Sequence, residues 1–114
     1  MKAITTHVLD TTRGRGAHGV EVVLALRLGA GPEWHTLAQE VTDENGRVGG
    51  FKTEPAFAAG VYRLRFGLGA YFDRQGSTTF YPYADVVFHV ADPRQHYHVP
   101  LLASPHGYTT YRGT

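Results

Sequence analysis

The histidines are the residues of this sequence most able to do chemistry, and there are seven of them in 114 residues. His96 and His98 are separated by one residue, so on a strand both side chains project from the same face. Because the ordinary pKa of histidine is about 6.5, such side chains can take or give a proton at neutral pH. The pair could instead begin a metal site, but zinc needs three or four ligands and His89 is the only obvious third one. We therefore favour proton transfer without a metal or other cofactor, and a histidine-dependent metalloprotein stays the alternative.

Two further candidates are His7, in the segment AITTHVLD, and Arg47, just after an Asn-Gly pair. Taken singly, each has an ordinary structural interpretation, His7 as a half-buried strand residue and Arg47 as a solvated residue after a hairpin. In a catalytic interpretation His7 is a general acid or base, and Arg47 is a planar, permanently charged donor for carbonyl or oxyanion groups. A serine nucleophile is not expected, because the sequence has no G-x-S-x-G motif and Ser104 lies in a turn.

The C-terminal segment YTTYRGT ends on chemically capable groups, whereas most chains end in a few frayed polar residues. We expect a strand that runs from Tyr108 to the terminal carboxylate of Thr114. This strand would carry the phenol of Tyr111 and the guanidinium of Arg112 to the end of the chain.

The elements that must position these residues are short strands rich in β-branched and aromatic residues and broken by Gly, Pro and Asn, a pattern typical of an all-β domain. We expect strands over residues 3–10, 20–28, 34–42, 60–67, 86–90, 95–105 and 108–114, and a weak short one over 48–53. The Asn-Gly pair in DENGR (residues 43–47) predicts a hairpin turn, and LGAYFDRQG (residues 68–76) predicts the only helix. Six to eight short strands in one domain indicate a β-sandwich or a small barrel.

Length and composition exclude several classes of protein. The 114 residues suit a single domain, and the formal net charge of +1 without a basic run predicts no nucleic-acid partner. The sequence has no cysteine, which excludes disulfides and thiolate chemistry. It also has no apolar run near the roughly 20 residues needed to cross a membrane, and its N-terminal segment lacks the apolar region of a signal peptide. We therefore expect a soluble cytoplasmic protein with no membrane partner.

Four separated segments carry a resemblance that no single residue carries, namely ITTHVLDTTRGRGAHGV, TDENGR, FYPYADVVFHV and HYHVPLLASPHGYTTYRGT. In this order they resemble the signatures of the 5-hydroxyisourate hydrolases, the transthyretin-related enzymes of urate breakdown. The resemblance covers essentially the whole chain, and the terminal Tyr-Arg-Gly-hydroxyl ending is its most specific part. That ending also separates the hydrolases from transthyretin proper, which shares the fold but binds hormones.

The resemblance implies a fold and an assembly. The implied fold is an all-β, transthyretin-like (prealbumin-like) β-sandwich of two four-stranded sheets with one short helix, here near Leu68 to Gln75. The implied assembly is a homotetramer, a dimer of dimers, whose sites lie in a channel at the dimer–dimer interface. Residues from more than one subunit would then form each site.

The resemblance also assigns residues by position. His7, Arg47 and His98 match the catalytic residues of the family, and Tyr111, Arg112, Gly113 and Thr114 match its terminal substrate-binding tetrapeptide. No metal ligand is among them.

Three positions depart from the pattern of the family. The chain ends in Thr114 where serine is usual, so the hydroxyl is kept and a methyl group is added. Gly16 stands where proline is common, with His18 where a small or variable residue often stands, and this bears on the rigidity of the first loop. Ala103 replaces the commoner leucine, which predicts a change in packing.

The implied reaction is hydrolysis of 5-hydroxyisourate to 2-oxo-4-hydroxy-4-carboxy-5-ureidoimidazoline. Water attacks the C6 carbonyl, and the N1–C6 bond opens. A neutral His7 or His98 would take the proton from water, and the sequence leaves the division between them open, with His7 favoured as the base. The alternatives from other classes are a transthyretin-like protein that binds a small ligand without catalysis, and a structural β-sandwich.

Overall fold

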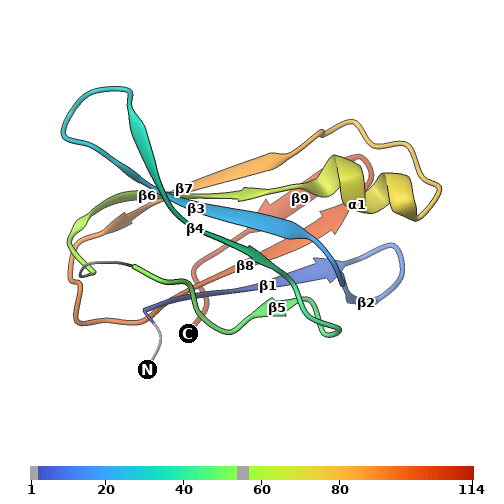
Figure 1. Cartoon of the computed structure of the whole chain (residues 1–114). Coiled ribbons are helices and arrows are strands. Elements are labelled where there is room, and N and C mark those ends of the chain that lie inside the picture. The colour runs from blue at the N-terminus through green and yellow to red at the C-terminus, as the bar shows by residue number, and fades with distance from the viewer. Residues whose placement is uncertain (1–2, 54–56) are drawn as a thin grey trace.

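The computed structural model describes residues 3–53 and 57–114, and within them it has nine strands and one helix (Figure 1). In chain order the elements are β1 (Ile4–Asp10), β2 (Arg15–Gly16), β3 (Glu21–Arg27), β4 (Trp34–Val41), β5 (Arg47–Val48), β6 (Gly60–Phe66), α1 (Leu68–Arg74), β7 (Ala84–Val90), β8 (Tyr97–Ser104) and β9 (Gly107–Thr110). None of the helical residues in the described part of the chain belongs to a segment long and apolar enough to cross a membrane.

The strands form two sheets. The first, called here sheet A, has the order β2-β1-β8-β9, and β5 also pairs with β1. In sheet A the pair of β1 and β8 is parallel, and the other pairs are antiparallel. The second, sheet B, has the antiparallel order β4-β3-β6-β7. The expectation of a transthyretin-like sandwich with a short helix is confirmed, and β5 adds a fifth short strand to the expected four of sheet A.

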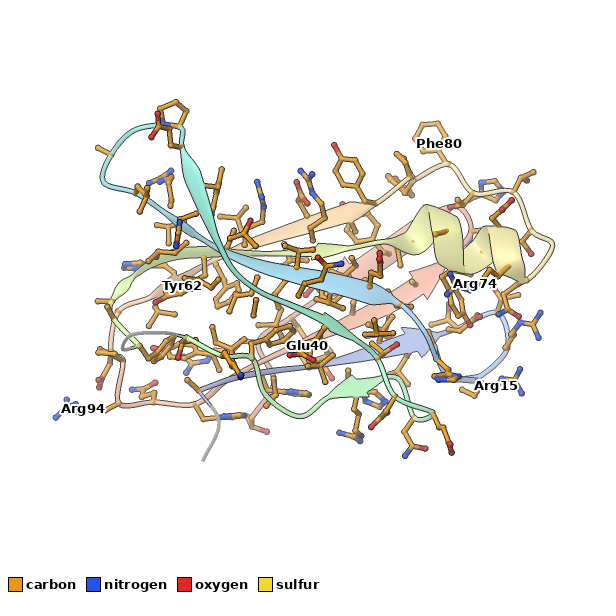
Figure 2. All side chains as sticks on the ribbon, viewed as in Figure 1. Arg15, Glu40, Tyr62, Arg74, Phe80 and Arg94 are labelled. Atoms are coloured by element: carbon orange, nitrogen blue, oxygen red, sulfur yellow. The ribbon has the colours of Figure 1, made fainter. Side chains whose placement is uncertain are left out.

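The core lies between the inner faces of the two sheets. Buried and partly exposed side chains alternate along β1 and β6, as in Ile4, Thr6 and Val8, so one face of each strand points into the core. Helix α1 covers one end of the sandwich with Leu68, Tyr71 and Phe72, and Ala103 is buried on β8. Figure 2 shows Phe80 projecting away from the sandwich and places Arg94 at the end opposite Arg15 and Arg74.

The expected strand from Tyr108 to Thr114 is wrong over its second half, because β9 ends at Thr110. The reason lies on its partner β8, where Pro100 has no N–H to donate to the next residue of the terminal segment. The Pro100 carbonyl instead accepts a hydrogen bond of 2.8 Å from the Thr110 hydroxyl. Beyond this interruption the chain returns to β8 through one antiparallel bridge between Gly113 and His98. Strand β3 also ends earlier than expected, at Arg27, and leaves Leu28 exposed.

Candidate active site

The outward face of sheet A brings the chemically capable residues of β1 and β8 together. The parallel register pairs Thr5 with His98 and His7 with Pro100. The side chains that precede and follow His98 on β8, Tyr97 and Val99, are buried, so alternation turns His98 to the outer face beside Thr5 and His7. His7 and His98 are both half-buried, within reach of solvent.

A threonine hydroxyl lies between the two histidines of the H-x-H pair. Thr5 Oγ1 is 2.8 Å from Nδ1 of His98 and 3.1 Å from Nε2 of His96. The expectation that His96 and His98 share a face is thereby confirmed. Thr5 is not among the expected site residues, although its place two residues before His7 on an alternating strand puts both side chains on one face.

His7 is held by the hairpin turn that the Asn-Gly pair predicts. Its Nε2 donates a hydrogen bond of 2.8 Å to the backbone carbonyl of Asn45. A carbonyl oxygen can only accept, so Nε2 carries the proton and a neutral His7 keeps its lone pair on Nδ1. Of the two ring nitrogens, Nδ1 is therefore the one that can accept a proton from water. Asn45 was also not identified as part of the site, because its backbone and not its side chain makes this contact.

The same turn places Arg47 beside His7. Strands β1 and β5 are antiparallel with His7 opposite Arg47, so the two side chains emerge on the same face as cross-strand neighbours. The Asp43 carboxylate shapes the turn by accepting hydrogen bonds of 2.9 Å from the backbone N–H groups of Asn45 and Arg47. These bonds hold the pKa of Asp43 below its ordinary value. The Arg47 side chain itself is exposed and can reach a bound molecule.

Two glycines allow this turn to pack against β1 and β2. Gly46 has a φ of +81°, a conformation that favours glycine, and a Cβ there would collide with the backbone carbonyl of Val8. A Cβ on Gly16 would collide with the carbonyl of Asn45, the group that accepts the hydrogen bond from His7 Nε2. The departure at Gly16 thus lies at the contact that orients a candidate catalytic histidine.

The electrostatics of the site keep His98 neutral. Burial lowers the pKa of His98, and the nearby His96, Arg47 and His7 lower it further. Since its ordinary pKa is already about 6.5, a lowered value leaves the imidazole uncharged at pH 7. The choice of which ring nitrogen carries the proton then decides what His98 can do.

The end of the chain reaches this site through its backbone. Gly113 N–H donates a hydrogen bond of 2.8 Å to the His98 carbonyl. A Cβ on Gly113 would lie 2.5 Å from Cδ2 of the His98 ring, so only glycine allows this approach. Thr114 follows as an exposed residue. These contacts bring Gly113 to His98, beside which His7 and Arg47 also lie.

Tyr111 and Arg112 lie elsewhere in the single chain. The Arg112 guanidinium donates to Gln95 Oε1 at 2.9 Å and stacks 4.5 Å from the ring centroid of Tyr97. Together with Tyr111 it lines a cavity of about 240 Å³, whose other lining residues come from β7, β8 and β9. The structure therefore brings His7, Arg47, His98 and Gly113 together, and it places Tyr111 and Arg112 at a separate cavity.

Among residues 3–53 and 57–114, no three histidine, cysteine, aspartate or glutamate side chains are grouped in a way that could hold a metal ion. The chemistry that the described arrangement supports is proton transfer and hydrogen bonding. It combines a histidine with a free lone pair, a neutral histidine beside it and a permanently charged arginine.

Comparison with known proteins identifies the relatives of this chain. Residues 4–113 match the family described as the HIUase/Transthyretin family. A 5-hydroxyisourate hydrolase of Halalkalibacterium halodurans is 47% identical over 97% of this chain and 97% of its own length. A probable 5-hydroxyisourate hydrolase of Schizosaccharomyces pombe is 43% identical over 98% of this chain and 91% of its own.

Two solved structures extend the comparison. The 5-hydroxyisourate hydrolase of Klebsiella pneumoniae superposes with a TM-score of 0.85 at 36% identity, covering 99% of this chain and 100% of that one. Sea bream transthyretin in complex with thyroxine superposes with a TM-score of 0.90 at 37% identity, covering 97% of this chain and 94% of that one. Fold similarity therefore does not separate the hydrolase from the thyroxine complex. The sequence matches do establish the wider group: the chain belongs to the HIUase/Transthyretin family.

Proposed function

We propose that this protein is a hydrolase that acts on 5-hydroxyisourate. The observation that carries the proposal is the cluster of His7, Arg47 and His98 on the outer face of sheet A. The names of relatives up to 47% identical over nearly the full chain support it. A carrier of hormones needs neither a base nor a permanently charged donor at that place.

In the proposed reaction, water adds to the C6 carbonyl of 5-hydroxyisourate to form a tetrahedral intermediate. The intermediate collapses as the N1–C6 bond breaks, N1 takes a proton, and C6 becomes the carboxylate of 2-oxo-4-hydroxy-4-carboxy-5-ureidoimidazoline. The reaction consumes one water and needs no oxidant, metal or other cofactor, because the cyclic imide-like carbonyl is already electrophilic.

Each catalytic residue has a proposed role that fits its contacts. His7 takes a proton from the attacking water through Nδ1, since its Nε2 proton is bound to Asn45. Arg47 offers paired N–H donors to the carbonyl edge of the planar substrate. A donor directed at the developing oxyanion contributes about 3–4 kcal/mol in comparable reactions, and Arg47 and His98 are the candidates for it.

The terminal tetrapeptide completes the proposed site in a homotetramer. We place Tyr111, Arg112, Gly113 and Thr114 in substrate binding, at a dimer–dimer interface where residues of more than one subunit meet. In the single chain Arg112 lies over Tyr97, and Tyr111 is exposed. An assembly that brings outer faces of sheet A together would let terminal residues of one subunit approach His7 of another.

We place the reaction in the cytoplasm and in purine catabolism, downstream of an oxidation that supplies 5-hydroxyisourate from urate. The alternative proposal is a small-ligand carrier of the same fold. The similarity to sea bream transthyretin, solved in complex with thyroxine, supports this alternative.

The test uses 5-hydroxyisourate generated freshly from urate with uricase, which is then removed. We expect wild-type protein to accelerate the loss of substrate absorbance, and we expect His7→Asn to lose most of this acceleration. Asn keeps a polar side chain at position 7 but cannot act as a base. A decay rate that stays at the spontaneous value with wild-type protein would favour the carrier.

A further inference from the structure

The hydroxyl of Thr5 has a single proton to share between two histidines. It lies 2.8 Å from Nδ1 of His98 and 3.1 Å from Nε2 of His96. A threonine hydroxyl donates one hydrogen bond and accepts others through its lone pairs. At most one of the two nitrogens can therefore accept a hydrogen bond from Thr5. At least one of the two histidines must therefore donate to Thr5, which couples the tautomer of one ring to that of the other.

The two distances distinguish the possible arrangements. Among hydrogen bonds to oxygen, those donated by hydroxyl groups are typically about 2.7–2.8 Å long and those donated by N–H groups about 2.9–3.0 Å, so a hydroxyl donor favours the shorter contact. The shorter contact fits Thr5 O–H donating to Nδ1 of His98, and the longer contact fits Nε2–H of His96 donating to Thr5. A neutral His98 then carries its own proton on Nε2.

We propose that Thr5 is a positioning residue that, together with His96, holds His98 in the tautomer with its proton on Nε2. The inference deepens the proposed hydrolysis and rests on it. In this tautomer His98 is a hydrogen-bond donor toward the substrate carbonyl. His7 has the complementary arrangement, because the Asn45 carbonyl fixes its Nε2 proton and leaves the Nδ1 lone pair free. The two histidines thereby receive opposite roles, His7 as base and His98 as donor.

The charged and titratable groups around His98 are consistent with a neutral ring. His7 faces it from β1, Arg47 from β5 and His96 from the position just before β8. Each of these three side chains disfavours a positive charge on the His98 ring. Arg112 approaches the carbonyl of His96 at 3.4 Å from the C-terminal segment and adds a further positive charge on that side. Because the ring is uncharged, only its tautomer separates a donor from an acceptor.

The test compares Thr5→Val, which keeps the size and branching of the side chain but removes the hydroxyl, with Thr5→Ser, which keeps the hydroxyl. Two-bond proton–nitrogen correlation spectra of protein with 15N-labelled histidine show which ring nitrogen of His98 carries the proton. The signals that disappear in His98→Gln identify this residue. Steady-state kinetics with 5-hydroxyisourate give kcat and KM for each variant.

We expect wild-type protein and Thr5→Ser to show His98 with its proton on Nε2. In Thr5→Val the spectrum should change to the other tautomer or to a mixture. Since this weakens the donor toward the substrate carbonyl, kcat should fall by about 100-fold with a smaller change in KM. A wild-type His98 protonated on Nδ1, or an unchanged tautomer and kcat in Thr5→Val, would overturn the assignment. If wild-type protein had no hydrolase activity, the proposed function would fail, yet the spectra would still decide whether Thr5 sets the tautomer.

Discussion

Gly113→Ala is the substitution whose effect follows most directly from the geometry. The added Cβ would lie 2.5 Å from Cδ2 and 3.2 Å from Cγ of the His98 ring. Ordinary van der Waals contacts begin at 3.4 Å, so either the ring or the terminal segment must move by about 0.9 Å. A movement of the ring changes its contact with Thr5, and a movement of the segment breaks the bond from Gly113 N–H to the His98 carbonyl.

The magnitude follows from the sensitivity of catalysis to position. A misplacement of about 1 Å commonly costs about 100-fold in rate, which corresponds to about 2.7 kcal/mol in the activation free energy. We therefore expect kcat for 5-hydroxyisourate to fall by about 100-fold in Gly113→Ala. The substitution lies near the chain end, so the thermal unfolding midpoint should change little.

Gly49→Ala is the matched control, since a Cβ on Gly49 would meet no atom within 4 Å and the residue lies outside the positive-φ region. It should keep wild-type kcat. The assay is the initial rate of absorbance loss at saturating substrate, with circular dichroism melts of each variant. If Gly113→Ala kept wild-type kcat while folded, the reasoning that Gly113 fixes the His98 ring would be refuted.

Three further predictions concern stability, its dependence on pH, and the turn that contacts His7. Tyr71→Phe removes the hydroxyl that donates to the buried Asp10 at 2.7 Å, so the free energy of unfolding in urea should fall by about 1–3 kcal/mol; an unchanged midpoint would contradict this. The pKa of His98 is lowered in the folded state, so below about pH 6.5 the unfolded state binds more protons than the folded state. The contribution of His98 to the free energy of unfolding should be complete above that pH and should decrease as the pH falls toward the folded pKa. In urea titrations at several pH values, His98→Gln should reduce this dependence of the unfolding free energy on pH. Gly16→Ala should displace the Asn45 carbonyl from His7 and lower both kcat and the melting temperature, and a variant with unchanged values of both would show that the turn tolerates a side chain there.

Much of the fold can be predicted from the sequence, because alternation is strong where one face of a strand is buried. Strands β1 and β6 follow this pattern, and helix α1 over Leu68–Arg74 agrees with the expected range of 68–76 to within two residues. The end of β9 could not be predicted in the same way, because it depends on Pro100 lying opposite the terminal segment. Only the register between the two strands reveals that opposition.

For the candidate site, the residue types can be read from the sequence, but the contacts between them cannot. The residue types of His7, Arg47 and His98 suggest proton transfer, but each has an ordinary structural interpretation when taken alone. Alternation on β1 puts Thr5 on the same face as His7, but its contact with His98 depends on the parallel register that pairs the two residues. The placement of Arg112 over Tyr97 depends on the path of the last residues after β9, which no strand pattern describes.

The contact between Asn45 and His7 could not be predicted from residue types. The backbone carbonyl of Asn45 accepts the hydrogen bond from His7 Nε2, so the side chain at position 45 carries no sign of the contact. The signal available in the sequence was the Asn-Gly pair, which predicts the turn but not the residue that the turn contacts.

A 13C label at the C6 atom of the substrate tests the proposed hydrolysis of 5-hydroxyisourate most directly. Urate labelled with 13C at C6 is converted by uricase to labelled 5-hydroxyisourate, and 13C NMR then records the conversion of C6 from a ring carbonyl to a carboxylate. We predict an initial rate of this conversion that rises in proportion to the concentration of wild-type protein and falls to near the spontaneous rate with His7→Asn. A rate of carboxylate formation that does not depend on protein concentration would contradict the proposal that this protein hydrolyses 5-hydroxyisourate.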